Sequence, residues 1–173
     1  RSLAFINHLT TLEELNLGGM VTYEDVSGIF MLPQLKKLYI SGMECEIDFD
    51  KITDNPSLES LEMAGIKLYE NVQIEGGYGI VSIDWDDVYL ADHLDFVAHF
   101  PNLKKLDVAD NKLENVDFAA ALMKLEEIDL SDNYVTDLHT LADLPALREV
   151  NCKGNPVSNL RVLDEERVNV ISK

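Results

Sequence analysis

A short leucine-rich phrase returns seven times along this chain of 173 residues at a nearly fixed period. Each copy has an apolar residue, two variable residues, a second apolar residue, one variable residue and a third apolar residue. The copies open at Leu12, Leu35, Leu58, Ile80, Leu103, Leu125 and Leu147, so successive openings lie 23, 23, 22, 23, 22 and 22 residues apart. A unit of this length cannot bury its apolar face alone, so the copies must stack into a solenoid.

The copy over residues 103–124 shows how one coil is built. The alternation in LKKLDV predicts a short strand that buries Leu106 and Val108 and exposes Asp107 to solvent. Residues 118–122 then predict a short helical arc on the outer side of the coil.

An asparagine follows the strand in the last three coils, at Asn111, Asn133 and Asn155. An inward amide there can donate to and accept from the backbone of neighbouring turns, which would otherwise hold buried, unsatisfied polar groups. We therefore expect a structural ladder of asparagines. The earlier coils carry apolar residues at the corresponding positions: Met20, Met43, Ile66 and Val88. Their turns are expected to be less regular and to satisfy the backbone by bonds between coils.

The fourth copy, IVSIDW, is the least regular. Its inward position holds Trp85, which is bulky for one coil. Either the ring fills the core under a widened turn, or this copy is out of register. The segment from Tyr69 to Gly79 is glycine-rich and is predicted to be a loose loop on the convex side.

These residues resemble the leucine-rich-repeat superfamily. The pattern LxxLxLxxNxLxxV, present here as LKKLDVADNKLENV, is most similar to the 22-residue class of bacterial internalin-type proteins and of some eukaryotic phosphatase-regulatory and dynein-associated repeats. The resemblance covers about residues 9–160. It implies an α/β fold, a curved right-handed solenoid of about seven coils. Its concave face would be a parallel β-sheet, and its convex face short helices or irregular arcs. It also implies recognition rather than catalysis.

The repeat predicts a single domain over residues 1–173. Residues 1–11 would form a partial N-terminal coil, residues 12–157 the seven repeats, and residues 158–173 a cap over the last coil. The chain opens without an initiator methionine or an apolar signal segment, so we expect it to be either a piece of a longer chain or a processed product. It has no run of about 18 apolar residues, so we expect no membrane insertion.

The formal net charge of −18 at pH 7 restricts the class of partner. A negative field repels phosphate backbones and attracts basic surfaces, so nucleic acid is disfavoured and a protein with a basic segment is favoured. The charge also has a simpler interpretation, which is solubility of an elongated surface.

The outward residues of the predicted strands form columns across the concave face. The middle column reads Asn16, Tyr39, Glu62, Asp84, Asp107, Asp129 and Asn151. It holds four consecutive carboxylates with one aromatic residue, and Asp86 and Glu127 flank it. The predicted partner-binding set is therefore Tyr39, Glu62, Asp84, Asp86, Asp107, Glu127 and Asp129. The alternative is a solvated face that is acidic because the whole protein is.

No motif in the sequence supports catalysis, a metal site or a cofactor. The stretch DLSDNYVTD resembles part of a calcium loop but lacks its glycine and terminal glutamate. The four histidines match no metal-ligand spacing. We therefore expect a monomeric, non-catalytic protein-recognition module, and the resemblance to internalin-type repeats implies that it is part of a larger bacterial secreted or surface protein. The alternative is an intracellular scaffold or regulatory subunit, and a signal peptide with a wall anchor in the full-length gene would favour the first.

Overall fold

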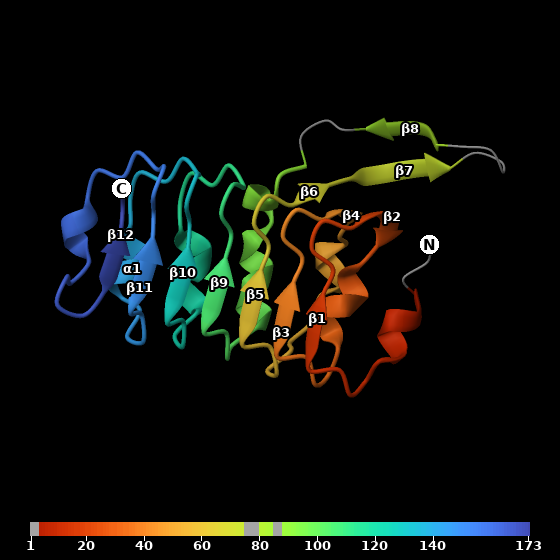
Figure 1. Cartoon of the computed structure of the whole chain (residues 1–173), viewed down its shortest axis with the longest axis horizontal. Coiled ribbons are helices and arrows are strands. Elements are labelled where there is room, and N and C mark those ends of the chain that lie inside the picture. Colours follow the sequence, from red (N-terminus) through yellow and green to blue (C-terminus); the bar gives the residue numbers. More distant parts are fainter. Residues whose placement is uncertain (1–3, 75–79, 85–87) are drawn as a thin grey trace.

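In the computed structural model, seven three-residue strands of the described residues form a parallel β-sheet along one face of the protein (Figure 1). The structure describes the backbone of residues 4–74, 80–84 and 88–173, and the side chains of these ranges except 4, 7, 70–74 and 80–84. In spatial order the strands are β1 (Glu14–Asn16), β3 (Lys37–Tyr39), β5 (Ser60–Glu62), β9 (Lys105–Asp107), β10 (Glu127–Asp129), β11 (Glu149–Asn151) and β12 (Asn169–Ile171). The predicted α/β solenoid with a parallel sheet is confirmed.

The central residue of each repeat strand carries the stack. Leu38 pairs with Leu61, and Leu61 pairs with Leu106, so that apolar side chains lie in one row across the sheet. All three are completely buried. Because side chains alternate along a strand, the flanking residues of each strand face solvent on the other side, which we call the sheet face.

The fourth copy does not enter this sheet. Strand β5 pairs directly with β9, with Ser60 opposite Lys105. The residues of the fourth copy form β8 (Ile80–Asp84) instead, which pairs antiparallel with β7 (Glu70–Ile74). The prediction that this copy supplies a sheet strand was wrong, because the alternation of a two-stranded ribbon also places apolar residues two apart. Trp85 lies outside the described residues, and the segment predicted as a loose loop contains β7.

The seventh strand of the sheet comes from the segment predicted to be the cap. Within residues 158–173, β12 pairs parallel with β11, and Val150 lies opposite Val170. The Arg167 guanidinium donates a 2.8 Å hydrogen bond to the carbonyl oxygen of Leu144. The C-terminal segment therefore extends the sheet and also satisfies backbone groups of the last repeat.

A second parallel sheet connects the early coils, which lack the ladder asparagine. It consists of β2 (Val21–Asp25), β4 (Glu44–Glu46) and β6 (Lys67–Leu68). The Glu44 amide donates to the carbonyl oxygen of Met20 at 2.9 Å, and the Lys67 amide donates to that of Met43 at 2.9 Å. These are the bonds between coils that the sequence predicts for this half. The β7–β8 hairpin continues from β6 and extends toward the N-terminal end (Figure 1).

Short helices cover the side of the solenoid opposite the sheet (Figure 1). In the described part of the chain, seven are 3-10 helices: η1 (Ala4–His8), η2 (Ser27–Met31), η3 (Phe49–Lys51), η4 (Leu90–Asp92), η5 (Leu94–His99), η6 (Asp117–Ala121) and η7 (Leu160–Val162). The eighth is α1 (His139–Ala142). The core between the helices and the sheet includes a cluster of phenylalanine rings, in which Phe96 packs against Phe30 and Phe100 at 5.4 and 5.7 Å between centroids. None of the helices in the described part of the chain is long and apolar enough to cross a membrane.

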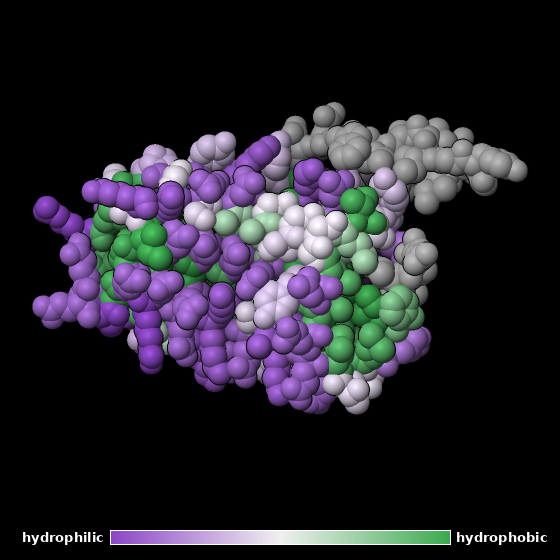
Figure 2. All heavy atoms as spheres, in the orientation of Figure 1, coloured by the Kyte–Doolittle hydropathy of each residue, from purple (hydrophilic) through white to green (hydrophobic). Residues whose placement is uncertain are grey.

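The two ends of the solenoid differ in their surfaces. At the N-terminal end Phe5 and Val21 are 60% and 53% exposed. Figure 2 shows apolar surface at this end and a second apolar area at the C-terminal end, whereas much of the surface between them is hydrophilic.

Candidate recognition surface

The observed register changes the middle column of the sheet face. It runs Asn16, Tyr39, Glu62, Asp107, Asp129, Asn151 and Ile171. Asp84 was predicted to stand in this column, but it belongs to β8 in the hairpin, outside the sheet. Asp86 lies outside the described residues. The structure therefore brings three carboxylates together in consecutive strands, where the sequence predicts four.

These carboxylates surround a shallow depression of about 130 Å³ over β5, β9, β10 and β11, which we call the acidic depression. Its lining combines acidic side chains with one lysine and a few strand residues: Glu62, Lys105, Leu106, Asp107, Glu127, Ile128, Asp129, Glu149 and Asn151. The Lys105 ammonium lies 3.8 Å from a Glu62 oxygen and 3.9 Å from a Glu127 oxygen. The lining thus holds one lysine and five carboxylates, so the acidic depression has a large excess of negative charge.

Part of the column also has a structural role. One oxygen of Asp107 accepts a 3.0 Å hydrogen bond from the Ala109 amide, and one oxygen of Asp129 accepts a 2.8 Å bond from the Ser131 amide. Such short-range bonds stabilise the turn where each strand ends. An asparagine can do the same through its amide oxygen, as Asn151 does for the Lys153 amide at 3.2 Å. The turn therefore needs an oxygen acceptor but does not need the charge.

The surroundings of Asp107 disfavour the charged form of its side chain. Burial raises the pKa of Asp107, and the nearby charge of Asp129 raises it further, while the Ala109 hydrogen bond and Lys105 oppose the shift. The second oxygen of Asp107 has no hydrogen-bond partner among the described residues. A cation from a partner placed at this oxygen would offset both unfavourable effects.

Tyr39 lies beside the acidic depression rather than within its lining. It stands in β3, directly opposite Glu62 of β5 in the register, and its side chain is half-buried. A partner that crossed the strands could contact the ring and the carboxylates together.

Asn133 makes the most complete set of hydrogen bonds in the asparagine ladder. Its amide nitrogen donates to the carbonyl oxygens of Val108 and Leu130 at 3.0 and 2.8 Å. Its amide oxygen accepts from the backbone amides of Asn111 and Leu113 at 2.9 and 3.0 Å. One buried side chain therefore satisfies backbone groups on two coils.

The other two ladder residues differ in how far they repeat this arrangement. Asn155 donates to the carbonyl oxygen of Leu130 at 2.8 Å and accepts from the Val135 amide at 2.9 Å. Asn111 donates to the carbonyl oxygens of Met63 and Ala109, both at 2.9 Å. Its amide oxygen accepts no hydrogen bond from any residue that the structure describes.

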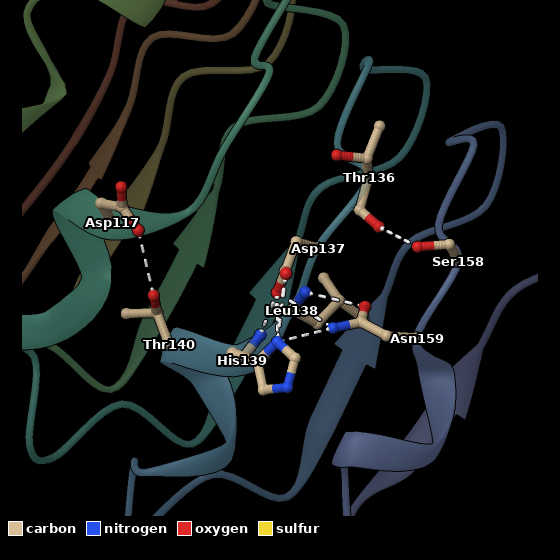
Figure 3. A network of polar contacts seen from close by, with 8 residues as sticks. All are labelled: Asp117, Thr136, Asp137, Leu138, His139, Thr140, Ser158 and Asn159. Carbon is tan, nitrogen blue, oxygen red and sulfur yellow. Dashed lines mark hydrogen bonds and ion pairs between the residues drawn. The ribbon is translucent and has the colours of Figure 1, made fainter.

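A second polar ladder, which the sequence reasoning missed, runs along the helical side (Figure 3). The Asn159 amide donates to Asp137 at 2.9 Å, and its oxygen accepts from the Leu138 amide at 3.0 Å. The pKa of Asp137 is lowered, first by the His139 backbone amide and then by Asn159 and the His139 ring. Asn115, Asp137 and Asn159 recur every 22 residues, four places after each ladder asparagine, and that period was the signal available. These contacts join neighbouring coils, so we assign them a structural role.

No cluster in the described part of the chain assembles three or more histidine, cysteine, aspartate or glutamate side chains in a geometry that could hold a metal ion.

The chain is similar to known repeat proteins in sequence and in structure. Residues 101–142 match the family model for leucine-rich repeats (two copies). A leucine-rich-repeat protein of Leptospira interrogans superposes with a TM-score of 0.62 at 21% sequence identity, covering 95% of this chain and 38% of that one. An internalin of Listeria monocytogenes superposes with a TM-score of 0.63 at 22% identity, covering 96% of this chain and 49% of that one. The chain thus spans less than half the length of either protein. No curated protein matches it.

Proposed function

Because the chain is a leucine-rich-repeat protein with an internalin-like fold, we propose that it is a non-catalytic module that binds a protein partner through the sheet face. The proposed contact residues are Tyr39, Glu62, Asp107, Glu127 and Asp129. The partner presents a basic segment, and the module acts as a monomer. Asp84 no longer belongs to the set, because β8 lies outside the sheet.

The observation that carries this proposal is the imbalance of charge in the acidic depression, where Lys105 faces five carboxylates. Like charges on neighbouring strands repel, and partial burial limits how well water screens them. An arginine or lysine of a partner relieves that repulsion as it binds. Complementary charge of this kind gives specificity and fast association more than raw affinity.

The repeat architecture supports recognition in preference to catalysis. Leucine-rich repeats are generally binding scaffolds, and their stacked strands present an extended surface. Three strands contribute acidic side chains at adjacent positions here, so a partner segment that crosses the strands meets a carboxylate on each.

A charge-matched pair of double variants tests the site. Asp107→Asn with Asp129→Asn removes two charges from the acidic depression while keeping the oxygen acceptors at both turns. Asp95→Asn with Asp143→Asn removes two charges from exposed positions on the helical side. The probe is fluorescein-labelled nona-arginine, with binding followed by fluorescence anisotropy.

We expect the sheet-face pair to weaken binding at least about tenfold, the equivalent of about 1.4 kcal/mol, and the helical-side pair to weaken it much less. Equal weakening by the two pairs would mean that the probe responds only to net charge. The sheet face would then be an ordinary solvated surface.

We further propose that the module belongs to a bacterial secreted or surface protein. The support is the resemblance of its repeats to the 22-residue internalin class. The second candidate is an intracellular scaffold or regulatory subunit. The full-length gene separates the two: a signal peptide and a wall anchor favour the first, and a gene without them favours the second.

A further inference from the structure

The strand ladder of the second sheet stops at β6, next to the hairpin. The Lys67 and Tyr69 amides donate to the carbonyl oxygens of Met43 and Cys45 on the β4 side, each at 2.9 Å. Successive residues of a parallel strand direct their backbone groups to opposite sides, so the N–H and C=O groups of Ile66 and Leu68 point away from β4. None of these four groups has a hydrogen-bond partner among the described residues.

A cleft of about 330 Å³ lies along this unpaired edge. Residues 65–69 line one side of it, residues 110–112 line the other, and residues 88–90 complete it. At the sheet end the cleft is closed, because the Gly65 amide donates a 2.9 Å hydrogen bond to the carbonyl oxygen of Ala109. Beyond this bond the two coils separate.

In the later, regular coils, hydrogen bonds from a ladder asparagine join neighbouring coils at the position that the cleft occupies here. There, Asn133 accepts from the backbone amides of Asn111 and Leu113 on the preceding coil. The pairing of Leu61 with Leu106 makes Ile66 and Leu68 the equivalent donors for Asn111. At this joint, however, the Asn111 amide oxygen and the Ile66 and Leu68 amides are all left without partners among the described residues. Unpaired donors therefore line one side of the cleft and an unpaired acceptor lies on the other.

We propose that an extended segment of a partner polypeptide binds in this cleft by adding a strand to the outer edge of β6. Its carbonyl oxygens accept from the Ile66 and Leu68 amides. Its own amides donate to the Leu68 carbonyl oxygen and to the Asn111 amide oxygen. Strand addition to an exposed sheet edge is a recurring mode of peptide recognition, in which the backbone gives affinity and nearby pockets give specificity.

The surroundings of Lys112 indicate one side chain of that segment. The Lys112 ammonium lies 3.9 Å from the centre of the Tyr89 ring and makes no ion pair with a described carboxylate. Lys112 and Tyr89 also line an adjoining depression of about 360 Å³, together with the rings of Phe118 and Tyr134 and the carboxylates of Asp92 and Glu114. Tyr134 is 60% exposed. A segment with one acidic residue among apolar ones fits this combination of aromatic rings and a lysine that has no ion pair among the described residues. This class of ligand differs from the basic segment proposed for the sheet face.

NMR titration of the ¹⁵N-labelled protein tests the proposal with acetyl-Val-Thr-Val-Glu-Val-amide as the probe. We expect saturable shifts of the Ile66 and Leu68 amide signals and about tenfold slower hydrogen exchange at both. The same peptide N-methylated at alternate residues keeps its side chains but loses the donors that strand pairing needs. It is expected to leave both signals unchanged. If the parent peptide leaves Ile66 and Leu68 unshifted, or the methylated peptide shifts them equally, strand addition at β6 is ruled out.

Two variants separate the parts of the proposal. Lys112 has a φ of 61°, a conformation that asparagine tolerates well, so Lys112→Asn removes the cation without straining the turn. It should weaken binding of the glutamate peptide about fivefold and leave a glutamine version unaffected. The Asp107→Asn and Asp129→Asn pair should leave this titration unchanged, so the result does not depend on whether the sheet face binds a partner. Equal weakening of both peptides by Lys112→Asn would contradict the assigned role of the cation.

Discussion

At the scale of single residues, polar side chains decide how the coils join. In the later coils an inward asparagine takes the place of the backbone hydrogen bonds that join the early coils through the second sheet. It can do so because its side-chain amide both donates and accepts hydrogen bonds. Asn133 does this while almost fully buried, and Asn155 does it while half-buried. The contribution of each ladder asparagine to the free energy of unfolding should therefore increase with the burial of its side chain.

We predict that Asn133→Ala lowers the free energy of unfolding by about 3 kcal/mol, because it leaves several buried backbone groups without partners. Asn155→Ala should lower it by about half as much, since water can reach part of that site. The measurement is urea unfolding followed by circular dichroism. Gln34→Ala, at an exposed position, is the control and should change stability by less than about 0.5 kcal/mol. Equal losses for Asn133 and Asn155 would show that burial does not set the strength of the ladder.

At the scale of elements, the joint between β5 and β9 is where the repeat and the structure diverge. The paired residues Ser60 and Lys105 are 45 positions apart, about twice the usual spacing, and the hairpin occupies much of the difference. The hairpin strands pair with each other and with no other strand of the described chain. The seven-stranded sheet is therefore continuous from β5 to β9 without any contribution from β7 or β8.

We predict that replacing residues 70–87 with two glycines preserves the seven-stranded sheet. The reason is that the register from Ser60 to Lys105 does not involve the hairpin. Tyr69 and Val88, which the glycines would join, line the same cleft. The check is a native-like circular dichroism spectrum with a cooperative urea transition. A non-cooperative transition would mean that the hairpin holds the two halves together.

This joint also shows how far the sequence could predict the fold. The leucine period placed every other copy correctly, since a row such as Leu38, Leu61 and Leu106 forms only if the coils stack in register. It failed at the copy that opens at Ile80, because an alternating ribbon and a repeat strand share the same local pattern. Because Asp84 belongs to this copy, it was wrongly predicted to lie in the candidate site on the sheet face. The role of Asp107 in stabilising the turn was also missed. The available signal was the recurrence of aspartate or asparagine at this strand end, because such side chains often accept from the backbone amide two residues on.

At the scale of the whole molecule, 32 acidic residues against 14 lysines and arginines produce strong self-repulsion. Such repulsion destabilises the compact state relative to the expanded chain, and salt screens it. We predict that the melting temperature rises by a few degrees between about 0.01 M and about 0.15 M NaCl, where the Debye length falls from about 30 to about 8 Å. Differential scanning calorimetry measures the shift. The Asp107→Asn and Asp129→Asn pair should show a smaller rise, and a fall with salt in the parent protein would contradict the prediction.

The long coil between β5 and β9 has a consequence for how such a molecule can change. Closing a flexible loop becomes only about 0.6 kcal/mol less favourable for each doubling of its length. The loss of chain entropy therefore adds little to the free energy of inserting a segment as long as the hairpin between two coils. An unrelated segment grafted between Tyr69 and Val88 should therefore leave the rest of the stack folded, which makes this joint a tolerant insertion point for protein engineering.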